Sequence, residues 1–163
     1  MANIAILLGS DSDLPVLDKG FKLMDKLGLE FELRILSAHR THDEVVEYIE
    51  SLDSKGIDVI IAGAGKAAHL PGVIAALTVK PVIGLPIRAS LDGVDALYSI
   101  VQMPGGIPVA TVGINASDNA VLLAAEMLSL KHPELVANLK QHRVEMKEAV
   151  LEKDRKIQAE YNK

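Results

Sequence analysis

The chain has 163 residues, of which 49% are hydrophobic, and this length and composition predict one globular domain and exclude wholesale disorder. Its net charge is −5, and no basic run precedes the C-terminal tail, so nucleic-acid binding is not expected. The chain contains no cysteine, which excludes disulfides, thiolate nucleophiles and thiolate metal sites. Neither a signal-peptide pattern nor a membrane-length apolar run is found, so we expect a cytoplasmic protein without a membrane partner.

Apolar segments of strand length alternate along the chain with segments of helical periodicity. This alternation predicts an α/β fold with a doubly wound parallel sheet, right-handed crossovers and helices on both faces. In such sheets, ligands bind beyond the carboxyl ends of the strands. We expect strands at 4–8, 31–36, 59–62, 81–85 and 108–112, and helices at 14–27, 43–55, from the third strand to 77, 94–102 and 118–130.

The C-terminal segment, residues 132–163, is helical in pattern and highly charged, and it follows the last predicted strand. Opposite charges near helical spacing, such as Glu152 and Lys156, favour a helix here. The segment is either a solvated surface helix or an arm that packs on a neighbouring subunit. We therefore divide the single domain, residues 1–163, into an α/β core, 1–131, and a C-terminal helical arm, 132–163.

The loop after the first strand reads Gly9-Ser10-Asp11-Ser12-Asp13-Leu14-Pro15. Its serine hydroxyls and the following helix N-terminus can form an oxyanion site. A carboxylate from Asp13 suits the hydroxyl groups of a sugar better than it suits a phosphate. These features suggest a ribonucleotide, but Ser12 or Asp13 can equally be a helix cap, with Pro15 in the first helical turn.

The loop after the second strand reads Ser37-Ala38-His39-Arg40-Thr41-His42. Arg40 can form bidentate hydrogen bonds to a phosphate, and His39 can donate and accept a proton. The alternative is structural: Thr41 or Asp43 caps the next helix, and the histidine and arginine are surface residues of the loop.

The segment Ile61–Gly72 begins at the end of the third strand and is rich in glycine and alanine. Its small residues predict a turn in which backbone N–H groups approach a ligand closely. His69 adds a side chain suited to proton transfer near neutral pH. Lys66 is a long cation among small residues.

This segment does not match the familiar phosphate-binding motifs well. A P-loop fails because Ile60 stands where the first glycine belongs and Ala67 replaces the hydroxyl residue that binds magnesium. The sequence Gly63-x-Gly65-x-x-Ala68 matches a loosened dinucleotide fingerprint only weakly, because it follows the third strand rather than the first.

Two further kinds of site have little support. A metal site built from His39, His42 and His69 lacks a His-x-x-x-His pair or an acidic cluster beside it, so no bound metal is expected. A Ser-His-Asp hydrolase lacks the Gly-x-Ser-x-Gly elbow.

Four motifs occur in order over nearly the whole chain, from about Asn3 to Leu130. Together they resemble the bacterial type, class I, of the 5-(carboxyamino)imidazole ribonucleotide mutase family of purine biosynthesis. The related branch, which carboxylates aminoimidazole ribonucleotide with free carbon dioxide, typically has an Arg-Ser-Asn loop at the third strand. The motifs are Gly9-Ser10-x-Ser12-Asp13, Ser37-Ala38-His39-Arg40-Thr41, Ala62-Gly63-Ala64-Gly65 with Ala67-Ala68-His69-Leu70-Pro71-Gly72, and Ser99-Ile100-Val101-Gln102-Met103-Pro104 with Gly106-Ile107-Pro108-Val109-Ala110.

The resemblance implies a three-layer, flavodoxin-like subunit within a homo-octamer whose active sites lie at subunit boundaries. It implies no metal, no nucleotide cofactor and no ATP. The implied reaction moves a carboxylate from the exocyclic nitrogen of the imidazole to ring carbon four. The substrate loses carbon dioxide in a closed site, the ring carbon captures it, and the ring proton then leaves.

The resemblance also implies which residues bind the ribonucleotide. Ser10, Ser37 and Arg40 hold the phosphate, and Asp13 holds the ribose hydroxyls. Ser12 belongs to the substrate-binding residues of the same loop as Ser10.

The remaining implied residues serve the chemistry. His39 is the general acid that protonates nitrogen as carbon dioxide leaves, and then the base at ring carbon four, since one histidine can do both. His69 supports the migrating carboxylate. The pocket for carbon dioxide, which is kept beside the nucleophile, is lined by Gly65, Ala67 and Leu70.

The chain departs from the family pattern in three places: Lys66 replaces glycine, His42 replaces proline, and the segment 87–92 is one residue shorter. Lys66 either places a charge beside the carboxylate or points to solvent or a neighbouring subunit. Three hypotheses follow: a mutase, a direct carboxylase of aminoimidazole ribonucleotide, and a non-catalytic nucleotide-binding paralogue whose pocket Lys66 has spoiled.

Overall fold

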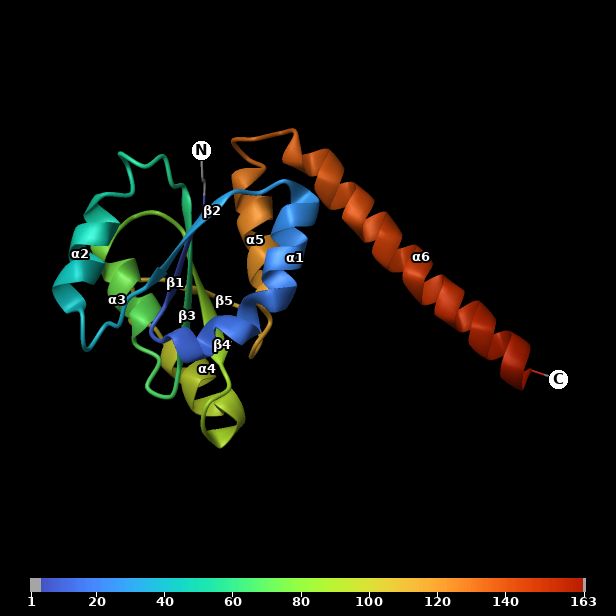
Figure 1. Cartoon of the computed structure of the whole chain (residues 1–163), viewed down its shortest axis with the longest axis horizontal. Helices are drawn as coiled ribbons and strands as arrows, with labels where there is room; N and C mark the ends of the chain where they lie inside the picture. The colour runs from blue at the N-terminus through green and yellow to red at the C-terminus, as the bar shows by residue number, and fades with distance from the viewer. Residues whose placement is uncertain (1–3, 163) are drawn as a thin grey trace.

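A five-stranded parallel sheet of order β2-β1-β3-β4-β5 forms the centre of the computed structural model, which describes residues 4–162 (Figure 1). This order and the helices on both faces confirm the predicted flavodoxin-like, doubly wound α/β fold. The strands are β1 (Ile4–Leu8), β2 (Phe31–Ile35), β3 (Val59–Gly65), β4 (Val82–Ile87) and β5 (Ala110–Thr111).

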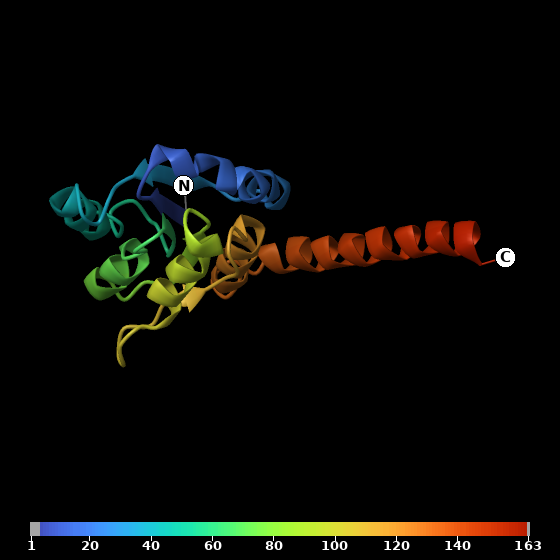
Figure 2. The same ribbon diagram turned by 90° about the horizontal axis from the view of Figure 1, so that it is seen from below.

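Helices cover the sheet on both sides and give the molecule three layers (Figures 1 and 2). The helices α1 (Asp18–Leu27) and α5 (Ser117–Leu128) pack on one face. The opposite face is covered by α2 (His42–Glu50), α3 (Leu70–Leu77) and α4 (Val94–Val101). Successive strand residues point to opposite faces, so the sheet contributes to two separate hydrophobic clusters.

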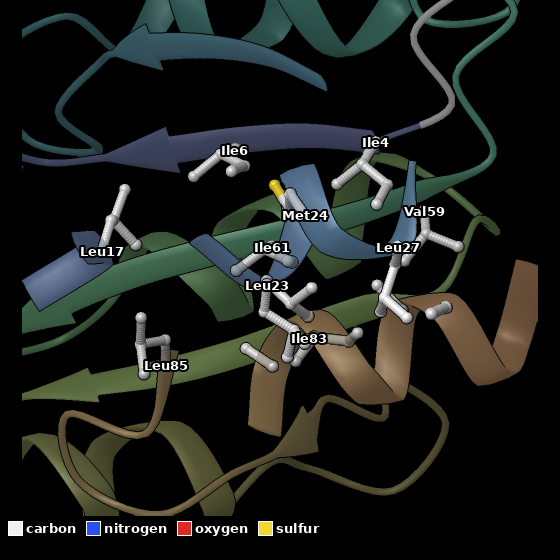
Figure 3. Close-up of a cluster of buried hydrophobic side chains, with 14 of the residues drawn as sticks. Ile4, Ile6, Leu17, Leu23, Met24, Leu27, Val59, Ile61, Ile83 and Leu85 are labelled. Atoms are coloured by element: carbon white, nitrogen blue, oxygen red, sulfur yellow. The ribbon is translucent and has the colours of Figure 1, made fainter. Parts of the chain in front are cut away.

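The cluster between the sheet and the pair α1 and α5 is shown in Figure 3. Ile6 of β1 and Ile61 of β3 lie side by side in the sheet register, and both are almost fully buried. Leu23 and Met24 of α1 pack among these strand side chains in the same cluster. All five residues of β1 are buried, which explains why its sequence is continuously apolar rather than alternating.

β3 is longer than predicted, because it continues through Gly65 instead of ending at Ala62. Gly63 and Gly65 therefore belong to the strand, and the expected glycine-rich turn is reduced to the residues that follow Gly65. A Cβ on Gly63 would lie 2.6 Å from Cδ2 of Leu8. The glycine thus permits close packing within the sheet, and it does not serve to bend the chain there.

β5 is shorter than the predicted 108–112 and contains only Ala110 and Thr111, which pair with Ile83 and Gly84 of β4. Pro108 precedes it and has no N–H group for a strand ladder.

The first helix begins differently from the prediction of 14–27. A 3-10 helix, η1 (Asp11–Leu17), leads directly into α1 and contains Pro15. Its cap is Ser10, whose hydroxyl accepts a hydrogen bond from the N–H of Ser12 at 3.3 Å. Neither Ser12 nor Asp13 is the cap, because the chain already turns helical at Asp11.

A buried serine connects this first segment to α5. The Ser117 hydroxyl donates to the carbonyl of Val16 at 2.7 Å and accepts from the N–H of Gly20 at 3.2 Å. Ser117 is 1% exposed, so both partners are satisfied in a place that water does not reach.

Two further predicted helices differ at their ends. α2 stops at Glu50 rather than at 55, and turns follow as far as Gly56, whose φ is +67°. The Ser51 hydroxyl donates to the carbonyl of Tyr48 at 2.7 Å and thereby competes with continued helix. α5 covers Ser117–Leu128, close to the predicted 118–130.

The C-terminal helix α6 (Leu135–Tyr161) extends away from the α/β core (Figures 1 and 2). Arg143 forms an ion pair with Glu126 of α5 at 2.9 Å, and Glu145 forms one with Lys26 of α1. At its N-terminal end, Leu135 is buried and Leu139 packs against the core cluster. After Glu145 the side chains of the helix are exposed, including several large apolar ones. Within the described residues, no helix is both long enough and apolar enough to cross a bilayer.

Candidate active site

A cleft of about 520 Å³ lies beyond the carboxyl ends of β1, β2, β3 and β4. Every residue that the sequence predicts for the site lines this cleft. They are Ser10, Ser12, Asp13, Ser37, His39, Arg40, Gly65, Ala67, His69 and Leu70. The topology explains the meeting: β1 lies between β2 and β3, and parallel strands bring their following loops to one edge.

The first loop presents two serine hydroxyls and a partly buried carboxylate. The hydroxyl oxygens of Ser10 and Ser12 lie 2.8 Å apart and share a hydrogen bond. Burial raises the pKa of the Asp13 carboxyl, and the charge of Asp11 adds to this, while a hydrogen bond from Ser12 opposes it. The Asp13 carboxylate therefore gains from any further hydrogen-bond donor that a ligand brings.

The second loop is held to the first by Arg40. Its Nη2 donates to the carbonyl of Gly9 at 2.8 Å, and its Nε donates to the Ser37 hydroxyl at 3.4 Å. A guanidinium has five N–H donors, so most remain for a ligand. Arg40 is thus fixed at the cleft by two contacts and is not a loose surface residue.

Thr41 occupies the cap position of α2, but its side chain makes no capping hydrogen bond. Its hydroxyl instead accepts from the N–H of Ser37 at 2.8 Å and donates to the carbonyl of the same residue at 3.2 Å. Thr41 is therefore at the expected cap position of α2, but without a side-chain capping hydrogen bond. Thr41 closes the loop that presents His39 and Arg40.

A histidine pair joins the second and third loops. Nε2 of His39 lies 2.8 Å from Nδ1 of His69, and the two rings meet edge to face with their centroids 4.9 Å apart. At this distance one nitrogen donates and the other accepts, so the tautomer of each ring depends on the other. The contact places a proton donor and a proton acceptor together inside the cleft.

The third loop spans only Lys66 to His69, and α3 begins at Leu70 with Pro71 in its first turn. The N–H of His69 donates to the carbonyl of Ala67 at 2.9 Å, which fixes the tight turn. Leu70 is buried beneath the loop. The cleft therefore has a wall of small residues, Gly65 and Ala67, beside the histidine pair.

Ala89 also lines the cleft beside these small residues, although no sequence motif indicated it. A Cβ on Gly65 would lie 3.1 Å from the Cβ of Ala89 and 3.1 Å from the carbonyl oxygen of Ile87. Strand pairing places Ala89 here: Gly65 pairs in register with Ile87, so the residues just beyond β4 lie next to the end of β3.

The described part of the chain contains no cluster of three His, Cys, Asp or Glu side chains placed to hold a metal ion. The side chains that line the cleft can form hydrogen bonds through hydroxyl and guanidinium groups and can transfer protons through imidazole.

Fold and cleft together define an α/β protein whose cleft places hydroxyl and guanidinium groups beside a histidine pair. A family model described as AIR carboxylase matches residues 3–149, and the chain belongs to this family.

Relatives from several organisms match nearly the whole chain. An N5-carboxyaminoimidazole ribonucleotide mutase from Thermotoga maritima is 50% identical, over 97% of this chain and 93% of its own length. One of the same name from Pyrococcus abyssi is 54% identical, over 90% of this chain and 85% of its own. A phosphoribosylaminoimidazole carboxylase from Schizosaccharomyces pombe is 51% identical over 95% of this chain, which spans 28% of that protein.

Solved structures carry the same fold. The crystal structure of Treponema denticola PurE superposes with a TM-score of 0.84 and 31% identity, covering 94% of this chain and 97% of that one. The crystal structure of a PurE2 variant from the same organism gives the same TM-score at 30% identity, covering 94% of this chain and 96% of that one.

Proposed function

We propose that the chain is an N5-carboxyaminoimidazole ribonucleotide mutase of de novo purine biosynthesis and that the cleft is its active site. It converts 5-(carboxyamino)imidazole ribonucleotide into 5-amino-4-imidazolecarboxylate ribonucleotide. The relatives of that name match this chain over nearly their full length. Because a ribonucleotide with two anionic groups does not cross a bilayer unaided, we also propose a cytoplasmic location.

The histidine pair is the structural feature that best supports this function. His39 and His69 touch at 2.8 Å between the hydroxyl and guanidinium groups of the first two loops and the small residues of the third. The reaction needs an anion-binding end, a proton carrier and a small space for carbon dioxide, and the cleft offers groups suited to each side by side.

The ribonucleotide binds through its phosphate and its sugar. The Arg40 guanidinium and the hydroxyls of Ser10 and Ser37 donate to the phosphate, because charged donors form the strongest hydrogen bonds to phosphate oxygens. Asp13 accepts hydrogen bonds from the ribose hydroxyls, which offsets the burial of its carboxylate. Ser12 supports Ser10 through their shared hydrogen bond.

His39 moves the protons in both halves of the reaction. The bond between the exocyclic nitrogen and the carboxyl carbon breaks, carbon dioxide leaves, and the nitrogen takes a proton from His39. Ring carbon four then attacks carbon dioxide, and its proton returns to His39, so no proton is gained or lost overall. His69 holds the other side of the pair and contacts the migrating carboxylate.

The small residues keep carbon dioxide in place between the two steps. Gly65, Ala67 and Leu70 line the space beside the histidine pair, and Ala89 limits it from the neighbouring strand end. Carbon dioxide that is held beside ring carbon four reacts as if it were highly concentrated. The ring carbon therefore does not have to capture carbon dioxide from solution in a slow bimolecular step.

A steady-state assay of the full-length protein separates this function from direct carboxylation. Direct carboxylation is the alternative because one relative, 51% identical, is named a carboxylase. We expect rapid formation of the 4-carboxylate product from the carboxyamino substrate without added bicarbonate. We expect slow formation from aminoimidazole ribonucleotide with bicarbonate. The reverse ratio would identify a carboxylase, and tight ribonucleotide binding without either reaction would identify a non-catalytic paralogue.

We further propose that the protein is a homo-octamer with active sites at subunit boundaries. Two surfaces of a single chain support an assembly, because large apolar side chains exposed together mark contact sites. One is the outer face of α4, with Val94, Tyr98 and Val101. The other is α6, on which the exposed large apolar residues are Val136, Val144, Met146, Val150, Leu151, Ile157 and Tyr161.

Light scattering on the full-length protein measures the assembly. We expect a mass near eight times the 17.5 kDa of one chain. A monomeric mass at micromolar concentration would contradict the octamer and leave both surfaces without a partner.

A further inference from the structure

Lys66 stands at a position whose backbone favours glycine. Its φ is +56°, in the left-handed region that L residues with long side chains rarely adopt. Within residues 4–162, the other non-glycine residues with positive φ are Leu91, Asp92 and Asn115, and none of them lines the cleft. Strained backbone of this kind is often found at functional sites, so the side chain of Lys66 calls for an explanation beyond packing.

No contact within residues 4–162 holds the ammonium of Lys66 in place. The side chain is exposed and lines the cleft, and it forms no hydrogen bond or ion pair with any residue between 4 and 162. Arg40, the other cation of the cleft, is by contrast bonded to the carbonyl of Gly9 and to Ser37. One cation is therefore fixed by the protein, while the other is available.

The two cations belong to loops on opposite sides of β1. Arg40 follows β2, Lys66 follows β3, and β1 lies between these strands. His39 and His69, which touch, belong to the same two loops. Each loop thus brings one cation and one histidine, so an anionic group on either side of the histidine pair meets a positive charge.

The substrate of the proposed function has two anionic groups, a phosphate on the ribose and a carboxylate on the imidazole. With the phosphate at Arg40, the carboxylate lies toward the histidine pair and the small wall, where Lys66 is the remaining unpaired cation. A carboxylate and an ammonium that meet in a partly enclosed cleft form a charge-assisted hydrogen bond.

We propose that Lys66 is a specificity-determining residue, whose ammonium pairs with the imidazole carboxylate of substrate and product. The inference rests on the proposed function of the cleft. It predicts selectivity for carboxylated ribonucleotides over aminoimidazole ribonucleotide, which carries the same phosphate and ribose but no carboxylate.

The test compares two ligands by calorimetry on the full-length protein. One is 5-amino-4-imidazolecarboxylate ribonucleotide, and the other is aminoimidazole ribonucleotide. With Lys66→Met we expect the Kd of the carboxylated ligand to rise about tenfold, the loss of one charged contact of about 1.4 kcal/mol. The Kd of aminoimidazole ribonucleotide should stay within about twofold, and Lys66→Arg should restore carboxylate affinity.

Arg88 provides the matched control. It follows Ile87, the register partner of Gly65, so Arg88 and Lys66 leave adjacent strand ends. Arg88 is exposed and does not line the cleft. Arg88→Met removes the same charge from the same edge of the sheet, and we expect it to leave both Kd values within about twofold of the wild type.

Equal weakening of both ligands by Lys66→Met, no weakening of either, or the same loss in Arg88→Met would overturn the proposal. A melting curve of each variant verifies folding before the comparison. The binding measurement does not depend on turnover: a wild-type protein that fails to convert the carboxyamino substrate refutes the proposed function, whereas the two Kd values still report on the carboxylate contact.

Discussion

Replacing His39 by asparagine should lower kcat at least a hundredfold, while the ribonucleotide still binds. Asparagine retains a hydrogen-bonding side chain but cannot exchange a proton near neutral pH, and general acid–base catalysis typically contributes about 10²–10⁴ in rate. In the proposed complex, Arg40, Ser10 and Asp13 hold the phosphate and the ribose, and the substitution leaves these residues in place. The measurement is kcat with the carboxyamino substrate, together with the Kd of aminoimidazole ribonucleotide.

His42→Asn is the matched control for this prediction. His42 is the first residue of α2, is exposed and does not line the cleft. The same chemical change three residues away should leave kcat close to that of the wild type. Turnover that survives His39→Asn would mean that another group moves the proton.

Replacing Gly84 by alanine should destabilise the protein strongly, although only one methyl group is added. Gly84 lies in the middle of β4, where a Cβ would overlap Cγ2 of Ile100 and lie 2.9 Å from Cγ1 of Val109. Overpacking of this kind typically costs about 1–3 kcal/mol of unfolding free energy. In a chain of this size, Tm should fall by roughly 2–4 °C for each kcal/mol.

Gly105→Ala controls for the general effect of adding a methyl group at a glycine. A Cβ at Gly105 meets no atom within 4 Å, and the residue does not have a positive φ. Its Tm should match that of the wild type within about a degree. Both variants are melted at one protein concentration, since assembly shifts apparent stability. An unchanged Tm for Gly84→Ala would show that α4 moves aside at little cost.

The fold could be predicted from the sequence because the patterns that indicate its strands and helices are local and recur along the chain. β1 is apolar throughout since both of its faces are covered, and each strand is followed by a helical pattern, which leaves a doubly wound parallel sheet as the solution. The strand ends were less accessible. Glycine normally signals a turn, but Gly63 lies within β3. A glycine is needed at this position because the side chain of Leu8 on the neighbouring strand fills the space that a Cβ would occupy.

The composition of the cleft was also accessible, because a parallel topology brings successive strand ends to one edge. What the sequence did not predict depends on side-chain direction and on pairs of residues far apart in the chain. The 2.8 Å contact of His39 with His69 spans thirty positions, and Ala89 reaches the cleft only through the register of β4 with β3. Likewise, no local pattern showed that Ser10 would be the cap of η1.

The Ser117 hydrogen bonds imply that, in the proposed complex, the ribonucleotide meets a segment whose far end is already fixed. This hydroxyl fixes the carbonyl of Val16 and the N–H of Gly20, and so anchors the far end of the segment whose near end carries Ser10 and Asp13. The conformational entropy of this segment is therefore lost when the chain folds, not when the ligand arrives. Binding energy from the phosphate and ribose is left to orient the imidazole for reaction.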